Sequence, residues 1–125
     1  MRSYAAAWHY ARFLDETYRR VLRPFRLTGR QGILIQALFD NDGLTQQELA
    51  AIVGMSATTV SQALRMLIES AYVIRRRNED GNRLYLTEAA RKIEPEFRKR
   101  VQYAEQNIQS AVFDFFPIQD AAKVS

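Results

Sequence analysis

The stretch from Gln46 to Arg65 decides the fold, and it reads QQELAAIVGMSATTVSQALR. Its apolar residues recur with helical spacing in two runs, which meet at Gly54, a residue that can take the left-handed conformation that ends a helix. Ser56 can cap the second run, because its hydroxyl can accept a hydrogen bond from the first helical turn. Two helices joined by so short a turn form a helix-turn-helix, so we expect helices over 46–53 and 57–70.

Small and apolar residues in this stretch can hold the two helices together. Ala50 must be small because the helices cross closely there, and Gly54 turns the chain. Upstream, Thr45 and Glu48 can form a capping box that starts the first helix. The positions that fix the crossing angle are all apolar: Leu49, Val53, Met55, Val60 and Ala63.

The outward face of the second helix carries small polar residues that suit contact with DNA. Small hydroxyl side chains let a helix approach base edges and phosphates, and Gln62 can pair with adenine and Arg65 with guanine, or either with a phosphate. The bland alternative is an amphipathic helix hairpin that tolerates Ser and Thr on its surface. The residues of this helix pair that we expect to bind DNA are Thr45, Gln46, Ser56, Ala57, Thr58, Thr59, Ser61, Gln62 and Arg65.

A β-hairpin is expected directly after the helix pair. Residues 72–77 and 83–86 are β-prone, and the Asp-Gly step between them favours a turn over 78–82. Such a hairpin is a wing, and an arginine at its tip can lie in a narrow, negative minor groove. Arg83 is the strongest candidate, whereas Arg76 should face the other side of its strand. The alternative for any one arginine is that it only keeps the strand soluble. The expected wing contacts are Arg75, Arg77, Asn82 and Arg83.

Further helices are expected on both sides of this segment. Apolar residues recur with helical spacing over 4–22, and Pro24 should end that helix. Thr28 can cap a helix that runs to the turn signal at 41–43.

The C-terminal part should also be helical, with one interruption. Thr87 can cap a helix, but Pro95 is expected to break it near Glu94, because proline removes a helical hydrogen bond. An apolar stripe continues over 96–116, and Pro117 should end the helix before a loosely ordered tail.

The expected fold class is mainly α with a small β-hairpin. With 125 residues, of which 47% are hydrophobic, the chain should form a single domain over 1–125. It would consist of a winged helix-turn-helix lobe over 28–86, flanked by dimerisation helices over 1–22 and 87–116. These flanking helices hold more apolar surface than a compact winged helix can cover, so two chains could cover each other in a homodimer.

Composition excludes several classes of protein. A net charge of +4 favours an anionic partner, although charge alone is a weak argument. There is no cysteine, and therefore no disulfide, no thiol nucleophile and no Cys-based zinc site. His9, the single histidine, is expected to be a packed or interfacial residue. Because the sequence also has no phosphate-binding glycine loop and no spaced cluster of metal ligands, we expect no metal, no cofactor and no enzymatic activity. Charged residues interrupt the opening segment, and no apolar run reaches membrane-spanning length, so a cytoplasmic protein is expected.

Taken together, these motifs resemble the MarR-type winged-helix regulators over roughly residues 4–112. The resemblance is carried by Leu44–Ala50 (LTQQELA), Ser56 with 58–61 (TTVS), 73–75 (VIR) and 86–88 (LTE). It implies a dimer whose first and last helices intertwine, recognition helices in successive major grooves and wings in flanking minor grooves, in a prokaryotic, nucleoid-associated protein.

The sequence departs from the family pattern at two places. Ala71 stands where a glycine usually follows the recognition helix, and 80–83 (DGNR) replaces the usual Asp-x-Arg motif in a wing that is about three residues shorter. The family often binds a phenolic or other small effector between the dimer region and the DNA-binding lobe. Aromatic residues at helical spacing more often form a core than a ligand site. The candidates for a small aromatic effector are Trp8, Phe13, Phe25 and Phe39.

The function expected from the sequence is a sequence-specific, double-stranded DNA-binding transcriptional regulator, and more specifically a repressor. It would bind a pseudo-palindromic operator as a homodimer, with helix 57–70 in the major groove and wing 73–86 near the minor groove. The alternative is a winged-helix protein-interaction module without sequence-specific DNA binding. Salt separates the two, because several arginine contacts to DNA make affinity fall steeply with salt concentration.

Overall fold

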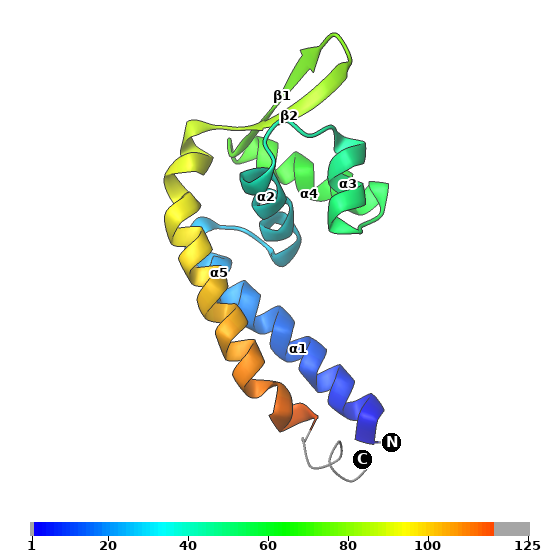
Figure 1. The fold of residues 1–125 in the computed structure, drawn as a ribbon, viewed down its shortest axis with the longest axis vertical. Helices are drawn as coiled ribbons and strands as arrows, with labels where there is room; N and C mark the ends of the chain where they lie inside the picture. Colours follow the sequence, from blue (N-terminus) through cyan, green and yellow to red (C-terminus); the bar gives the residue numbers. More distant parts are fainter. Residues whose placement is uncertain (1, 117–125) are drawn as a thin grey trace.

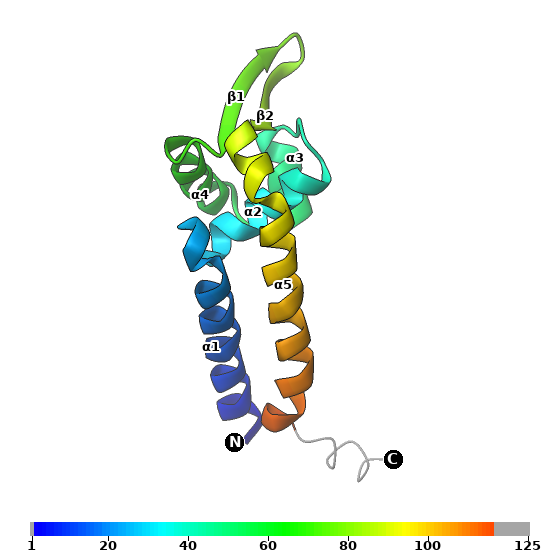
Figure 2. The ribbon, with the colours of Figure 1, turned by 90° about the vertical axis from the view of Figure 1, so that its left-hand side faces the viewer.

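The structure is a computed structural model, and it describes residues 2–116. Figures 1 and 2 show a stalk formed by the first and last helices, with a lobe at one end from which a hairpin projects. The mainly helical fold with one small hairpin is confirmed. In chain order the elements are α1 (Arg2–Leu22), the 3₁₀ turn η1 (Arg23–Phe25), α2 (Gly29–Asp40), α3 (Gln46–Val53), α4 (Ala57–Glu69), β1 (Val73–Asn78), β2 (Gly81–Leu86) and α5 (Glu88–Phe115).

The helices begin where the sequence supplies N-caps. Thr28 and Gln31 form a capping box at α2, and Thr45 and Glu48 form the expected one at α3. The hydroxyl of Ser56 accepts from the backbone of α4, and that of Thr87 from the backbone of α5. Each of these caps satisfies a backbone N–H that has no partner within its own helix.

The core of the lobe is continuous with the base of the stalk. Phe97 of α5 is 1% exposed and packs between Phe25 and Phe39, with ring centroids 5.9 and 5.3 Å away. Gly32 lets α1 and α2 come close, since a Cβ atom there would lie 2.6 Å from Cδ1 of Leu22. The fully buried residues contributed by the lobe itself are Leu34, Ile35, Leu38, Leu49, Val60, Leu64, Leu67, Val73 and Leu84.

The expected break near Glu94 is wrong, because α5 is one continuous helix with Pro95 inside it. Proline has no N–H, so the carbonyl of Arg91 loses its helical donor. Side chains on adjacent turns nevertheless bridge this point, since Glu94 binds both Arg91 and Arg98. The expected helix end at Pro117 and the tail beyond it lie outside the described residues.

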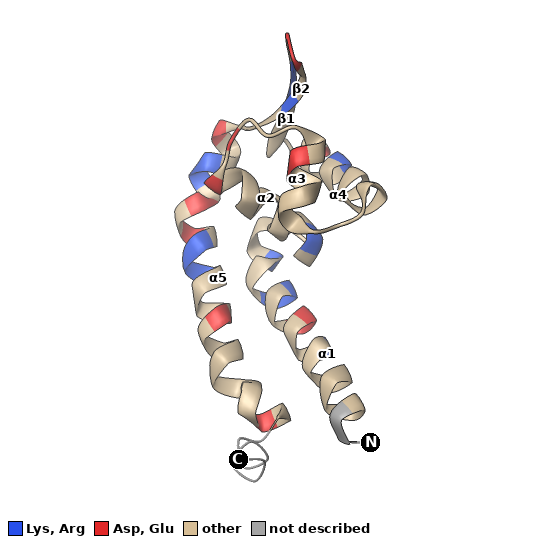
Figure 3. Cartoon of the chain, turned by 45° about the vertical axis from the view of Figure 1, so that its right-hand side comes forward, with Lys and Arg blue, Asp and Glu red and all other residues tan. Residues whose placement is uncertain are grey.

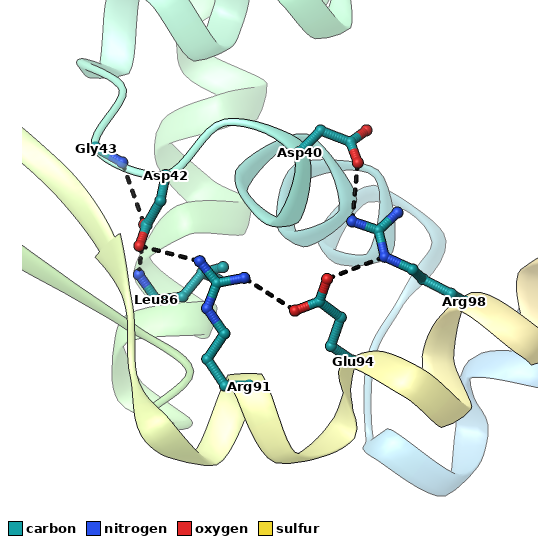
Figure 4. A network of polar contacts seen from close by, with 7 residues as sticks. All are labelled: Asp40, Asp42, Gly43, Leu86, Arg91, Glu94 and Arg98. Atoms are coloured by element: carbon teal, nitrogen blue, oxygen red, sulfur yellow. Dashed lines mark hydrogen bonds and ion pairs between the residues drawn. The ribbon is translucent and has the colours of Figure 1, made fainter.

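A ladder of ion pairs joins α5 to the lobe (Figure 4). Arg98 donates to Asp40 at 2.9 Å and to Glu94 at 3.0 Å, and Arg91 donates to Glu94 at 2.9 Å. Arg91 also donates to Asp42 at 3.3 Å. The hydrogen bond from Arg91, followed by that from Arg98, lowers the pKa of Glu94 below its ordinary value of 4.5.

Asp42 extends the ladder toward the hairpin. Its Oδ1 accepts from the backbone N–H of Leu86 at 2.9 Å and from that of Gly43 at 3.1 Å. The side chains of α5 are therefore connected to the end of β2 and to the loop that leads into α3.

Helix α4 ends in a motif that usually contains glycine. The N–H of Tyr72 donates to the carbonyl of Leu67, and the N–H of Ala71 donates to that of Ile68. This is the Schellman arrangement, which needs a left-handed residue directly after the C-cap. Ala71 takes this conformation, with φ of 62°, at the position where the family pattern has glycine.

None of the single helices within residues 2–116 combines the length and the apolar composition of a membrane span. Helices α3 and α4 reach these values only when they are taken together, and the chain bends by 112° between them.

Replacing Ala71 with glycine should stabilise the protein. An L-residue in the left-handed region carries about 1–2 kcal/mol of strain, and the greater freedom of glycine in the unfolded chain offsets part of this, which leaves a gain of about 0.5–1 kcal/mol. Urea unfolding of Ala71→Gly measures the gain. The matched control is Ala51→Gly, which removes the same exposed methyl group within helix α3 and should destabilise by about 0.5–1 kcal/mol. A lower stability of Ala71→Gly would contradict this account.

The ladder should make stability depend on pH in the acid range. Because the pKa of Glu94 is lowered in the folded state, its contribution is fully present above about pH 4.5 and is lost as the pH falls through the folded-state pKa. Urea unfolding at pH 7 should therefore find Glu94→Gln less stable than wild type, and the gap should shrink by pH 3. Glu79→Gln, which changes an exposed hairpin carboxylate, is the control. A gap of equal size at both pH values would argue against the ladder.

Candidate nucleic-acid interface

Helices α3 and α4 form the expected helix-turn-helix, because the chain bends by 112° between them. Gly54 makes the turn with φ of 68°, and its N–H donates to Ala50 at 2.9 Å. One side of α4 is buried in the lobe through Val60, Ala63, Leu64 and Leu67. The opposite side is left exposed, and it carries Thr58, Ser61, Gln62 and Arg65.

At the start of α4, Ser56 and Thr59 bond to each other, whereas Ala57 and Thr58 are exposed. Ser56 is the N-cap of α4, and its hydroxyl donates to Oγ1 of Thr59 at 2.9 Å. The N–H of Thr59 donates in return to Ser56 at 3.1 Å, so Thr59 is half-buried against the cap. Ala57 lies exposed in the first turn beside Thr58.

The hairpin and the helix pair enclose an open groove of about 560 Å³. Arg75 contacts the start of α3 across this groove, since its Nη2 donates to Oε1 of Gln46 at 3.2 Å. Five residues expected to bind DNA therefore meet on one surface, together with three that were not predicted to bind DNA. The lining residues are Thr45, Gln46, Gln47, Ser61, Arg75, Asp80, Asn82 and Leu84.

The strand register separates the arginines of the wing into two faces. Arg75 pairs with Leu84 and Arg77 with Asn82, so these four side chains share the face toward the groove. Arg76 pairs with Arg83 on the other face, where the Arg76 guanidinium lies 5.6 Å from the ring centroid of Tyr85. The expected placement of Arg76 is confirmed, and Arg83 shares its face.

The turn of the hairpin is tighter than expected. Asn78 pairs with Gly81, so only Glu79 and Asp80 form the turn, whereas the sequence suggested a loop over 78–82. The tip is therefore acidic, as the red segment above the blue strand in Figure 3 shows. Arg75, Arg77 and Arg83 lie on the strands that flank this tip, as the sequence indicated.

Arg83 is the most enclosed arginine of the wing, with 28% of its side chain exposed. Nη1 donates to the carbonyl of Gly43 at 2.9 Å and lies 3.5 Å from Oε1 of Glu48. Nε donates to Asp80 at 3.4 Å, and Nη2 forms an ion pair with the same carboxylate. The hydrogen bond from Arg83 lowers the pKa of Asp80, and the hydrogen bond from the backbone N–H of Thr45 is the main cause of the lowered pKa of Glu48.

A short backbone pairing beside Arg83 was not predicted from the sequence. Leu44 forms an isolated antiparallel bridge with Leu84. The N–H of Gly43 donates to the carbonyl of Leu84 at 2.9 Å, and the N–H of Leu84 donates to that of Leu44 at 2.8 Å. The loop before α3 is thus fixed to β2. The only local signal for it is the apolar Leu44 between a turn and a helix cap.

The four aromatic residues expected to line an effector pocket do not meet in one cavity. Phe25 and Phe39 are buried around Phe97, because long-range packing of α5 places them in the core. Trp8 is 51% exposed, beside His9 and Arg12. Phe13 packs instead on two other rings of the stalk, those of Tyr10 and Phe115.

A different cavity, of about 360 Å³, lies between α1, α2 and α5. Tyr18 lines it, and burial, followed by the charge of Glu105, raises the pKa of this tyrosine above its ordinary value of 10.0. The remaining lining residues are Leu14, Asp15, Leu22, Gly29, Arg30, Gly32, Ile33, Gln36, Phe97 and Val101.

Comparisons with known proteins agree with this geometry. Residues 31–73 match the family model for winged helix-turn-helix DNA-binding domains. None of the curated protein sequences matches the chain.

Solved structures of similar fold cover nearly the whole chain. A MarR transcriptional regulator from Methanosarcina mazei Go1 is 22% identical with a TM-score of 0.76, over 96% of this chain and 84% of that one. Reduced AbfR bound to DNA is 17% identical with a TM-score of 0.69, over 89% and 90%. Wild-type MarR from E. coli in the apo form is 17% identical with a TM-score of 0.66, over 97% and 87%. Residues 31–73 thus match the winged helix-turn-helix model, and the chain has the fold of the MarR transcriptional regulators.

Proposed function

We propose that this protein is a sequence-specific regulator of transcription that binds double-stranded DNA through α4 and the wing. The observation that carries the proposal is the exposed side of α4, where uncharged polar residues and Arg65 stand next to the polar groove of the wing. A surface of this kind can enter a major groove without bringing a carboxylate toward the phosphates in its first turns. One of the similar solved structures, AbfR, is described as bound to DNA.

The groups of the interface suit different parts of DNA. Gln62 and Arg65 can reach base edges from α4, since amide and guanidinium groups pair with adenine and guanine. Thr45, Gln46 and Ser56 stand at the starts of two helices, where backbone N–H groups attract phosphate. Arg75 and Arg77 can bind the backbone or the minor groove from the wing, together with Asn82.

The proposed assembly is a homodimer formed through the stalk. Large apolar side chains on α1 and around α5 are open to solvent, which is costly for a single chain and is relieved when a second copy covers them. Two copies would set two recognition helices about 34 Å apart, one turn of DNA, on an imperfect palindrome. The exposed apolar residues of the stalk are Tyr4, Trp8, Tyr103, Phe113 and Phe116.

The regulatory sign that fits best is repression. A dimer bound at two successive major grooves covers the DNA to which a polymerase must bind, and it needs no second contact surface to do so. Such a protein would act on the nucleoid, in the cytoplasm of a prokaryote.

Selection from a random double-stranded DNA pool tests the proposal. The wild type should select an imperfect palindrome, and the logarithm of its affinity should fall steeply with the logarithm of salt concentration, because bound phosphates release counterions. Gln62→Ala and Arg65→Ala should change base preference at one position of each half-site. Arg77→Ala should weaken binding evenly across sequences. Arg76→Ala, on the other face of the wing, is the control.

Two other outcomes of this selection would contradict the proposal. Binding that is flat with salt, or no enrichment of any sequence, would favour the protein-interaction module. Identical selection profiles for Gln62→Ala, Arg65→Ala and Arg77→Ala would refute the division between base and backbone contacts.

The proposed effector site is the cavity between α1, α2 and α5. Its lining is mostly apolar, and of its two charged residues Asp15 is paired with Arg19, while Arg30 offers a positive charge that suits the carboxylate of a small aromatic acid. Aromatic acids should raise the melting temperature of the wild type, because a ligand that binds only the folded state stabilises it. Arg30→Ala should reduce this shift, and Arg23→Ala, an exposed arginine outside the cavity, should not. No shift in any variant, together with unchanged DNA affinity, would remove the effector.

A further inference from the structure

We propose that Arg83 is a positioning residue that holds the wing against α3, and that Arg75 and Arg77 supply the wing's contacts to DNA. This inference rests on the proposed function, since it divides the work of a DNA-binding surface. It also reverses the expectation from sequence alone, which made Arg83 the leading contact.

The guanidinium of Arg83 is already engaged on every nitrogen. Nη1 donates to the Gly43 carbonyl and faces Glu48, while Nε and Nη2 both bind Asp80. Contact with a phosphate or a base edge would have to compete with these partners for the same guanidinium. The exposed guanidinium of Arg77 has no such contact with an acidic group among the described residues.

The partners of Arg83 belong to different elements. Gly43 lies in the loop between α2 and α3, Glu48 belongs to the capping box of α3, and Asp80 lies in the turn of the hairpin. Arg83 itself lies on β2, next to Leu84, whose backbone pairs with the same loop. One side chain therefore fixes the turn and one strand of the wing to the start of the helix-turn-helix.

The local charge also disfavours a direct contact between Arg83 and DNA. One arginine faces two carboxylates, those of Glu48 and Asp80, so this cluster carries a net negative charge. Negative charge repels phosphate, and the Arg83 cation is largely neutralised by its own partners. On the groove face, two arginines, Arg75 and Arg77, stand beside Asn82, and the carboxylate of Asp80 that also lines the groove is already paired with Arg83.

The dependence of DNA affinity on salt separates positioning from contact. An arginine that neutralises a phosphate contributes about 0.9 to the slope of log affinity against log salt concentration. We would measure this slope with the full chain on the selected site, for wild type and for the variants Arg83→Ala, Arg77→Ala and Asp80→Ala.

The expected results differ in slope and in sign. Arg83→Ala should lower affinity several-fold with the wild-type slope, whereas Arg77→Ala should lower the slope by about 1.8, because the proposed dimer carries two copies of each wing. Asp80→Ala should also lower affinity, although removal of a negative charge near DNA would by itself raise it. A slope reduced by about 1.8 in Arg83→Ala, or tighter binding by Asp80→Ala, overturns the inference.

Hydrogen exchange in the DNA-free protein provides an independent readout. Arg83→Ala should speed the exchange of the Gly43 and Leu84 amides, which hold the loop to β2, and leave Val101 in α5 unchanged. Arg83→Gln, which can still donate to the Gly43 carbonyl, should lie between Arg83→Ala and wild type. Unchanged exchange at Gly43 and Leu84 overturns the inference. A wild type that binds no DNA removes the proposed function, and this measurement still decides whether Arg83 holds the wing.

Discussion

The burial of Phe97 is the contact on which the rest of the structure depends. Its ring fills the space between Phe25 and Phe39, so it connects the last helix to the core of the lobe. A buried phenylalanine is worth about 3–5 kcal/mol, a large share of the 5–15 kcal/mol that separates a typical folded domain from its unfolded state. Val101 and Ala104 continue the buried side of α5 along the stalk.

Two sets of polar contacts connect α5 and the wing to the helix-turn-helix, and both sets include residues of the loop between α2 and α3. From one side, Arg91 and Arg98 of α5 bind Asp42 and Asp40. From the other, Arg83 of the wing binds Gly43 and faces Glu48. This loop is therefore the place where the stalk, the wing and the helix-turn-helix are held in register. The outward side of α4 takes part in neither set of contacts.

Local signals made most of the fold predictable. A helix cap involves residues three positions apart, so Thr28, Thr45, Ser56 and Thr87 could be read from the sequence. Features that depend on distant residues could not. Arg98 and Asp40 lie 58 positions apart, and the ladder they complete spans Pro95, where a break was expected.

In the candidate site, too, features set by local sequence were predictable and features set by distant residues were not. The exposed residues of α4 were predictable from helical spacing, because only one side of the helix can face the core. The hydrogen bond from Arg83 to the Gly43 carbonyl was not, since Gly43 lies 40 positions away in the chain. The separation of the four aromatic residues proposed for an effector was not predictable for a related reason, because the place of Phe25 and Phe39 is set by Phe97.

Because α5 is one unbroken helix, a tilt at one end displaces the other end. From Phe97 to Phe115 the helix extends about 27 Å at 1.5 Å per residue, so a tilt of about 10° at Phe97 would displace the far end by about 5 Å. Phe97 lies two residues after Pro95, the residue that leaves one helical hydrogen bond unmade. Phe97 and Val101 also form part of the wall of the 360 Å³ cavity. Because Phe115 packs on Tyr10 and Phe13 of α1, a rearrangement of that wall that tilts α5 would have to move the aromatic end of both stalk helices together.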